Sequence, residues 1–414
     1  MKTRSDARFT AFLCMAEIGT MLGYATFPTL LHTLQQAWGM SNTQAGVVSG
    51  AYFGGYMLAV PLLTALTDRF DARHIYIFAC LLAALGSFGF AFAVGGFISA
   101  ALFQACVGAG LAGTYMPGLK ILSDHVQGPM QSRYVSFYTT CFTLGASASF
   151  VLPIVLMPAF SWQAVFAISG IGPVIAALMV WRIPPAPRAA PPVAPTGPGR
   201  SLLWMLDFRP VLKNRPAMGY ILGYTAHCFE LLGSRSWLVA FIGFAAATHG
   251  QAAFVAPAII AAFVNFLGMP ASIFGNELAM RFGRRRMILI YMALSGLTGC
   301  AVGFTAPLAL PFTVACLCLY TALVMADSSS LTAGTVAEAA PDKRGITLAL
   351  HSTLGFGAGI LSPTLFGWVL DHSGGNGATH AWGLAYASQG VLCLAAPLLV
   401  WLLRGRGTRG KARC

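Results

Sequence analysis

Four titratable side chains lie inside long apolar stretches of the sequence, where a charge is costly. They are Glu17, His227, Glu230 and Asp327. If these stretches cross a bilayer, each ionisable group costs about 2.5–3.5 kcal/mol on insertion scales, so it survives by facing a partner or a water-filled cavity. Carboxyl and imidazole groups can exchange protons near neutral pH. The pattern predicts proton coupling, and the alternative for each residue is a structural hydrogen bond.

Helical spacing groups these residues on polar faces. Tyr24 follows Glu17 by seven residues and shares its face. His227 and Glu230 are three residues apart, which favours a coupled carboxylate–imidazole pair. Asp327 lies deep in a later apolar stretch, where it could pair with a cation, take up a proton or accept a hydrogen bond from a substrate.

Arg235 is the one basic residue that lies clearly away from the basic loops and termini. On an ideal helix it points about 140° away from Glu230, so we expect no direct ion pair between them. Its guanidinium suits a bidentate grip on an anionic substrate. The alternative is that it extends to the outer interface beside Trp237.

Uncharged polar residues complete a candidate substrate-binding cavity. Lone tyrosines and amides on apolar helices also form hydrogen bonds between helices, so each has a structural alternative. Together with Arg235, the candidates are Tyr24, Tyr52, Tyr56, Tyr115, Tyr138, Asn265 and His351.

Composition indicates the elements that must position these residues. The chain is 57% hydrophobic and 9% charged, whereas soluble domains are roughly a quarter charged. A membrane-spanning helix needs about 20 mostly apolar residues. We therefore expect an all-α membrane protein of about twelve spanning helices in two six-helix bundles. The apolar runs lie near 9–31, 43–66, 74–95, 97–121, 134–157, 163–182, 216–243, 252–276, 287–305, 310–335, 345–370 and 381–403.

The net charge of +13 does not indicate a nucleic-acid partner, because the basic residues lie in the termini and in alternate loops. This asymmetry follows the positive-inside rule and predicts that both termini are cytoplasmic. The first apolar run lacks a small-residue cleavage site, so we do not expect a removable signal peptide.

A proline-rich segment divides the chain. Residues 183–200 contain seven prolines, which favours an extended linker, and the stretch that follows could lie along the membrane surface as an amphipathic helix. The expected units are a six-helix bundle at 1–182, a linker at 183–215 and a second six-helix bundle at 216–414. Internal repeats around a central linker are typical of secondary transporters.

The loop at 67–73 and its counterpart at 280–286 carry the repeat, and both resemble a signature of the major facilitator superfamily, Gly-x-x-x-Asp-Arg-x-Gly-Arg-Arg. The copies depart from it at Thr64, Asp71, Asn276 and Met280. In that family the loop latches the cytoplasmic side, and its arginines pair across the halves. The resemblance implies gating roles, and the alternative is that the charges only set the topology. The matching residues are Asp68, Arg69, Arg73, Arg281, Arg284 and Arg285.

The resemblance also implies that the two halves rock around a central site. Gln104 stands where many family members have an arginine that helps proton coupling. The fifth apolar run lacks the Gly-Pro-x-x-Gly-Gly segment typical of drug–proton antiporters. We therefore expect a proton-coupled carrier of a small organic solute, with Arg235 favouring uptake of an organic anion. The alternative is a proton-driven efflux pump for amphipathic compounds.

Other classes of protein are disfavoured. Nine of the ten cysteines lie in apolar runs, so we expect no structural disulfide. The sequence has no ATP-binding loop, metal-ligand cluster or nucleophile motif, so we expect neither enzyme activity nor a cofactor or metal. A membrane enzyme or sensor remains the third alternative. We expect a monomer in a bacterial inner membrane.

Overall fold

The structure is a computed structural model that describes residues 2–67, 70–126, 131–185, 207–248, 256–340 and 343–403. This part of the chain is helical and contains no strand. Twelve of its helical segments are long and apolar enough to cross a membrane, and each coincides with one of the predicted runs. The expected all-α membrane fold is therefore confirmed.

The first six spans are built from α1 to α8. The first and fourth spans each consist of two helical pieces, and the others are continuous. The bounds are α1 (Lys2–Thr20), a 3-10 turn (Met21–Gly23), α2 (Thr26–Trp38), α3 (Asn42–Leu66), α4 (Ala72–Ala93), α5 (Phe97–Ala112), α6 (Tyr115–His125), α7 (Gln131–Leu156) and α8 (Trp162–Trp181).

The last six spans follow the short helix α9, which lies within the expected linker; residues 186–206 of that linker are outside the described residues. The tenth span is again made of two pieces. The bounds are α9 (Arg209–Lys213), α10 (Arg215–Thr248), α11 (Pro257–Phe282), α12 (Arg284–Val302), α13 (Leu310–Ala326), α14 (Ser328–Glu338), α15 (Arg344–His372) and α16 (Thr379–Leu402).

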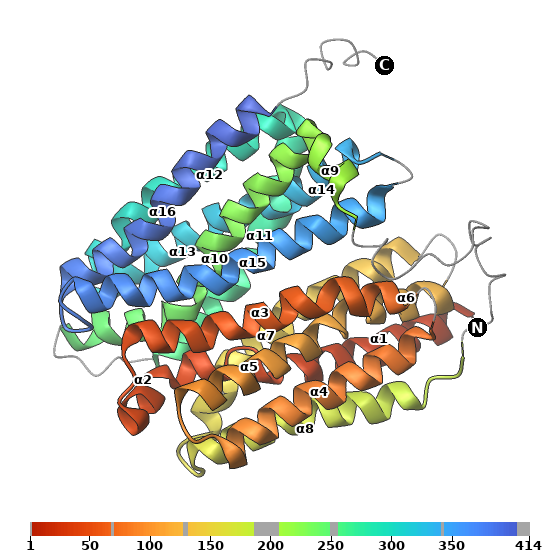
Figure 1. Ribbon diagram of the computed structural model, residues 1–414, viewed down its shortest axis with the longest axis horizontal. Helices are drawn as coiled ribbons and strands as arrows, with labels where there is room; N and C mark the ends of the chain where they lie inside the picture. Colours follow the sequence, from red (N-terminus) through yellow and green to blue (C-terminus); the bar gives the residue numbers. More distant parts are fainter. Residues whose placement is uncertain are drawn as a thin grey trace.

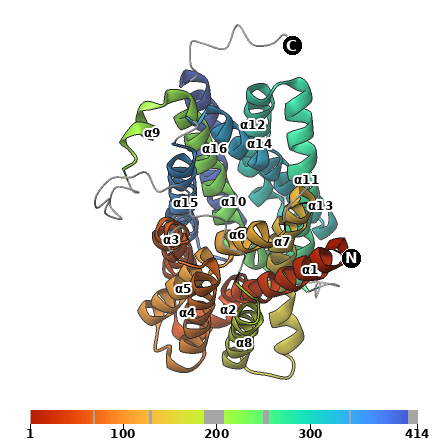
Figure 2. The same ribbon diagram turned by 90° about the vertical axis from the view of Figure 1, so that its right-hand side faces the viewer.

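The two sets of helices form two halves (Figure 1), which meet where α3 lies against α15, α7 against α11 and α2 against α10. Seen end-on, α15 lies over α3 at one side of the interface and α11 lies over α7 at the other (Figure 2). We call the end where α1 begins and α16 ends the basic end, and the opposite end the far end. In Figure 1 the halves are close at the far end and diverge towards the basic end.

Backbone contact between α3 and α15 holds the halves together at the far end. A side chain at Gly46 would collide with the carbonyl of Pro363, and one at Gly50 would collide with the carbonyl of Ile360. Only glycine permits such an approach of two helix backbones. Towards the basic end, the same two helices instead line a cavity of about 560 Å³.

Helix breaks are the main departure from the predicted spans, which the sequence indicated as continuous. The first span unwinds at Met21–Gly23, and Ser149 of α7 accepts a hydrogen bond from the freed amide of Ala25 at 3.1 Å. The fourth span breaks at Gly113 and Thr114, and the tenth breaks at Asp327. Interrupted helices of this kind often form the binding sites of transporters.

Asp71 caps α4 at the basic end and pairs with Arg73. Its Oδ1 accepts a hydrogen bond from the Arg73 backbone amide at 2.9 Å, and its Oδ2 lies 2.6 Å from Nη2 of Arg73. The hydrogen bond from the Arg73 side chain holds the pKa of the Asp71 carboxyl below its ordinary value. The pair therefore stabilises the folded state above the pKa of the unfolded chain, about 3.9, and this contribution is lost as the pH falls through the lower pKa of the folded state.

We expect Asp71→Ala to lower the free energy of unfolding by about 1 kcal/mol at pH 7, because a helix cap is lost. The difference from the wild-type protein should shrink as the pH falls below about 3.9 and on through the lower folded-state pKa of Asp71. Chemical unfolding in detergent at pH 7 and pH 3 measures both effects. Asp124→Ala is the control, since Asp124 forms only an exposed pair with Lys120 at 3.6 Å. An equal loss in both variants would contradict the assignment.

Candidate substrate and proton-coupling site

Arg235 of α10 lies between the two halves. It lines a small central cavity of about 20 Å³ together with Tyr24 and Tyr52 of the first half. On its other side it lines a second cavity of about 10 Å³ with Asn265 and Tyr320 of the second half. Each volume is room for about one water molecule. The predicted substrate residues Tyr24, Tyr52, Arg235 and Asn265 are thus close together.

The guanidinium of Arg235 has no acidic partner among the described residues. Its Nη2 lies 3.6 Å from the sulfur of Met325, a weak acceptor. No ion pair joins Arg235 to Glu230. Trp237, the expected neighbour at the outer interface, is fully buried and donates to the carbonyl of Pro363 at 3.0 Å. A half-buried arginine without an acidic partner, placed where the two halves meet, can bind an anion.

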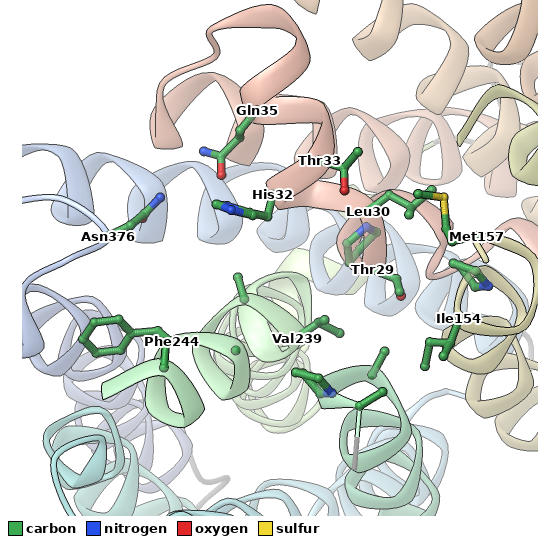
Figure 3. Close-up of a pocket in the computed structure, with 18 of the residues that line it drawn as sticks. Thr29, Leu30, His32, Thr33, Gln35, Ile154, Met157, Val239, Phe244 and Asn376 are labelled. Carbon is green, nitrogen blue, oxygen red and sulfur yellow. The ribbon is translucent and has the colours of Figure 1, made fainter. Parts of the chain in front are cut away.

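A larger cavity of about 710 Å³ opens beyond the central cavity at the far end, and Pro28 lines both. Figure 3 shows His32 and Gln35 of α2 and Asn376 along one side of it, with Phe244 of α10 opposite. Most of its other lining residues are apolar. The cavity therefore lies on a route between the far end and Arg235.

An aromatic contact separates the central cavity from the basic-end cavity. The rings of Tyr56 on α3 and Phe356 on α15 lie 4.0 Å apart, one from each half. Tyr56 also lines the basic-end cavity, whereas Tyr52, one helical turn earlier, lines the central one. The predicted substrate residue Tyr56 is thus positioned at the inner boundary of the site.

His227 pairs with Asp327, not with Glu230 as the sequence spacing suggested. Its Nδ1 lies 2.7 Å from Oδ1 of Asp327, and both side chains are 1% exposed. The helix break at Asp327 gives this residue its place between α13 and α14, facing α10. The i, i+3 spacing describes only one helix, whereas the partner comes from another. A buried acid–imidazole pair can hold or release a proton.

Glu230 lies in a separate polar contact within the second half. Its Oε2 accepts a hydrogen bond from Ser295 at 2.9 Å, and the side chain is fully buried. It forms no ion pair with a described residue. The second half therefore contains two buried acids with different partners.

Glu17 is the buried acid of the first half. Its Oε2 accepts hydrogen bonds from the hydroxyls of Tyr138 at 2.9 Å and Tyr76 at 3.4 Å. Tyr138 is fully buried. The substrate role predicted for Tyr138 is therefore not supported, since its hydroxyl is engaged by Glu17.

Tyr115 and His351 also make internal contacts instead of facing a described cavity. Tyr115 packs against Phe142, with ring centres 5.1 Å apart. His351 stacks on Tyr224 at 3.8 Å, and its two ring nitrogens lie 3.3 and 3.2 Å from the hydroxyls of Thr332 and Thr335. In this conformation both predicted substrate residues support the packing around the site.

Two of the predicted gating arginines that the structure describes, Arg73 and Arg285, pair within their own halves. Arg285 contacts Glu338 at 3.2 Å and the Tyr220 hydroxyl at 3.3 Å, and Arg73 pairs with Asp71 as above. Arg281 and Arg284 form no ion pair with described residues. The pairing across halves that the resemblance implied is absent from this described part, because the halves are apart at the basic end. Asp68 and Arg69 lie outside the described residues.

The far end is joined by an acid that sequence reasoning missed. A capping box between Ser41 and Gln44 starts α3, and the next two amides, of Asn42 and Thr43, donate to the carboxylate of Asp371 at 3.0 and 2.8 Å. The side chains of Asn42 and Thr43 donate to it at 2.9 and 2.6 Å. Asp371 lies in the last turn of α15, so these four bonds join the two halves. The sequence did offer one signal for this contact: Asp371 is an acidic residue in the stretch 371–380, which contains no lysine or arginine.

We expect Asp371→Ala to shift the protein towards conformations that are open at the far end. Charged hydrogen bonds contribute about 1.5–3 kcal/mol each when buried, so a net effect of about 2 kcal/mol, roughly 30-fold, is expected for this partly exposed group. The rate at which a membrane-impermeant thiol reagent labels Thr29→Cys in the far-end cavity reports the opening. Asp124→Ala at the basic end is the control. Equal labelling rates in all three backgrounds would contradict a latch at Asp371.

Metal binding is not suggested by the described residues. Among them, no group of three or more His, Cys, Asp or Glu side chains is placed to hold an ion. The cysteines of this part are all free.

Comparisons with known proteins assign the fold to a family. The profile of the Major Facilitator Superfamily matches residues 13–272. Human spinster homolog 1 is 22% identical over 247 residues, 57% of this chain and 46% of that protein. The 4-hydroxybenzoate transporter PcaK of Pseudomonas putida is 23% identical over 317 residues, 65% of each chain. The match thus spans less than two thirds of either relative.

A solved structure supports the same fold. The crystal structure of a bacterial homologue of the human lysosomal transporter spinster, inward-facing and unoccupied, matches with a TM-score of 0.70 at 16% identity, over 96% of this chain and 95% of that one. The chain belongs to the major facilitator superfamily. Its described residues contain twelve helices long and apolar enough to span a membrane, as expected of a multi-pass membrane protein of this family.

Proposed function

We propose that the protein is a proton-coupled secondary transporter that takes up a small organic anion by alternating access. The observation that carries the proposal is Arg235, a cation that lacks an acidic partner among the described residues and lies where the halves meet. A permanent charge in this position is costly unless a ligand or water compensates it. A carboxylate offers the bidentate geometry that a guanidinium binds best.

Proton coupling is supported by the buried acids on either side of Arg235. His227 lies on the same helix as Arg235, about two turns away, and pairs with Asp327 from the break between α13 and α14, while Glu17 and Glu230 are buried with hydroxyl donors. Arrival of an anion beside Arg235 changes the charge that these groups sense, which links substrate binding to their protonation. Glu17, His227, Glu230 and Asp327 are the proposed coupling residues.

The direction of transport is inferred from charge and shape. The basic loops and both termini belong on the cytoplasmic side by the positive-inside rule. The far end, joined by Asp371, then faces outwards, and the basic-end cavity opens inwards. We infer an inward-facing conformation of a monomeric carrier in a bacterial inner membrane. Asp68, Arg69 and Arg73, with Arg281, Arg284 and Arg285, would close its inner side.

An aromatic carboxylate is the proposed substrate class. One relative, PcaK of Pseudomonas putida, is a 4-hydroxybenzoate transporter. In this chain Tyr24, Tyr52 and Phe53 line the central cavity beside Arg235. Aromatic side chains provide flat apolar surfaces on which a ring can stack, while the guanidinium binds the acid group.

Uptake by proteoliposomes that contain the purified protein tests this proposal. We expect benzoate or hydroxybenzoate to accumulate when the outside is made acidic, and a proton ionophore to abolish accumulation. Sugars and amines at the same concentrations serve as negative controls. If carboxylates neither accumulate nor raise the melting temperature of the protein, the proposal is wrong.

The apolar far-end cavity of about 710 Å³ favours one alternative, proton-driven efflux of amphipathic compounds. A thermal-shift panel at pH 5.5 and 7.5 separates the two, because a ligand that binds only the folded state raises its melting temperature. Stabilisation by diverse amphipathic cations, unaffected by Arg235→Ala, would support efflux. Stabilisation by carboxylates that is lost in Arg235→Ala would support uptake of an anion.

A further inference from the structure

Two polar side chains share the central cavity with Arg235 and have no partner there. Ser49 on α3 is 5% exposed and Gln104 on α5 is 3% exposed. The Ser49 hydroxyl has no hydrogen-bond partner, and no hydrogen bond joins the Gln104 side chain to another described residue. Ser236, which lines the same cavity, differs because its hydroxyl donates to the carbonyl of Leu232 at 2.8 Å.

Close packing of α3 on α5 fixes where these two groups lie. A side chain at Gly108 would collide with the carbonyl of Tyr52, and one at Gly55 would collide with that of Ala105. Ser49 and Gln104 each lie about one turn towards the far end from this crossing. Both belong to the first half, whereas Arg235 belongs to the second, so the cavity has a cationic wall and a neutral polar wall.

Buried hydroxyl and amide groups are nearly always hydrogen-bonded in folded proteins, because an unpaired one costs free energy. Two unpaired groups in one cavity therefore indicate an occupant that supplies donors or acceptors. A single water fits the present volume. A larger occupant requires the halves to separate at the cavity, which the proposed alternating access provides.

We propose that Ser49 and Gln104 form a specificity subsite that hydrogen-bonds a hydroxyl or carbonyl group at the end of the substrate opposite its carboxylate. The inference rests on the proposed function, in which Arg235 binds the carboxylate. A serine hydroxyl and a carboxamide can each donate and accept, so together they suit a hydroxyl group. A site built in this way selects against the analogue that lacks the hydroxyl, because binding that analogue leaves both groups unpaired.

Dissociation constants of benzoate and the hydroxybenzoate isomers, measured by calorimetry on the full-length purified protein, test the subsite. We expect at least one hydroxybenzoate to bind the wild-type protein about threefold to tenfold more tightly than benzoate, as one or two neutral hydrogen bonds would give. In the Ser49→Ala/Gln104→Leu double variant this preference should disappear without a loss of affinity for benzoate, because benzoate then leaves no polar group unpaired. Ser236→Ala is the matched control, because its hydroxyl is already engaged, and it should keep the preference.

The outcomes separate the subsite from the proposed function. A preference that persists in the double variant overturns the subsite alone and leaves an ordered water as the occupant. If Arg235→Ala binds benzoate as tightly as the wild-type protein, Arg235 does not anchor the carboxylate and both proposals are wrong. Both are also wrong if the wild-type protein binds no carboxylate. If the double variant fails to fold, the single variants Ser49→Ala and Gln104→Asn provide the same test. Gln104→Asn keeps the amide but shortens the side chain by one methylene.

Discussion

Arg235→Ala is expected to weaken carboxylate binding by roughly 30- to 150-fold and to reduce saturable uptake accordingly. The estimate follows from about 2–3 kcal/mol for charged hydrogen bonds in a site shielded from water. Arg235→Lys should recover part of the binding, since an ammonium keeps the charge but loses the planar bidentate fork. Calorimetry and initial uptake rates in proteoliposomes measure both variants.

Stability separates a binding role for Arg235 from a structural one. Because Arg235 has no acidic partner among the described residues, its removal strands no buried carboxylate. The melting temperature of Arg235→Ala without substrate should therefore equal or exceed that of the wild-type protein, since an uncompensated charge is removed. A structural arginine would instead leave a destabilised variant.

Arg286→Ala is the control for a general effect of positive charge. Arg286 is exposed at the basic end and forms no ion pair with described residues. We expect its carboxylate affinity to match that of the wild-type protein. Equal losses in Arg235→Ala and Arg286→Ala would mean that the central cavity is not the anion site.

The spans could be predicted from sequence because lipid imposes a simple requirement. Each crossing needs a continuous apolar run, and charges collect in the loops, so hydropathy and basic residues are sufficient. The helix breaks could not be predicted in this way. The break at Asp327 falls inside a run that reads as one helix, and the partner of Asp327, His227, lies on a span about 100 residues earlier in the chain.

The candidate site shows the same limit. The expectation that Arg235 does not pair with Glu230 rests on helical angle alone, and no ion pair joins the two side chains. The partner of His227 was predicted wrongly, because i, i+3 spacing gives neighbours on one helix and says nothing of those across an interface. Asp371 was missed for the same reason: its partners, Asn42 and Thr43, begin a helix of the other half.

Asp327→Asn is expected to uncouple transport from protons while leaving the site folded. Asparagine keeps the size of the side chain and a polar oxygen facing His227, whose Nδ1 lies 2.7 Å from Oδ1 in the wild-type protein, but it cannot take up a proton. With one proton per substrate, a gradient of one pH unit supports about tenfold more accumulation, since each unit is worth about 1.4 kcal/mol. The variant should lose this dependence on the gradient.

Exchange of labelled for unlabelled substrate across the proteoliposome membrane isolates the coupling step, because exchange needs binding and rocking but no net proton movement. Asp327→Asn should retain exchange and lose accumulation driven by an imposed pH gradient. Asp124→Asn, which removes an exposed carboxylate beside Lys120, should retain both. If Asp327→Asn still accumulates substrate with wild-type dependence on pH, Asp327 carries no coupled proton and its contact with His227 serves only to join α10 to the break in the tenth span. If exchange is lost together with accumulation, the residue acts in binding or rocking, and coupling must be sought at Glu17 and Glu230, the two buried acids whose partners are hydroxyl groups.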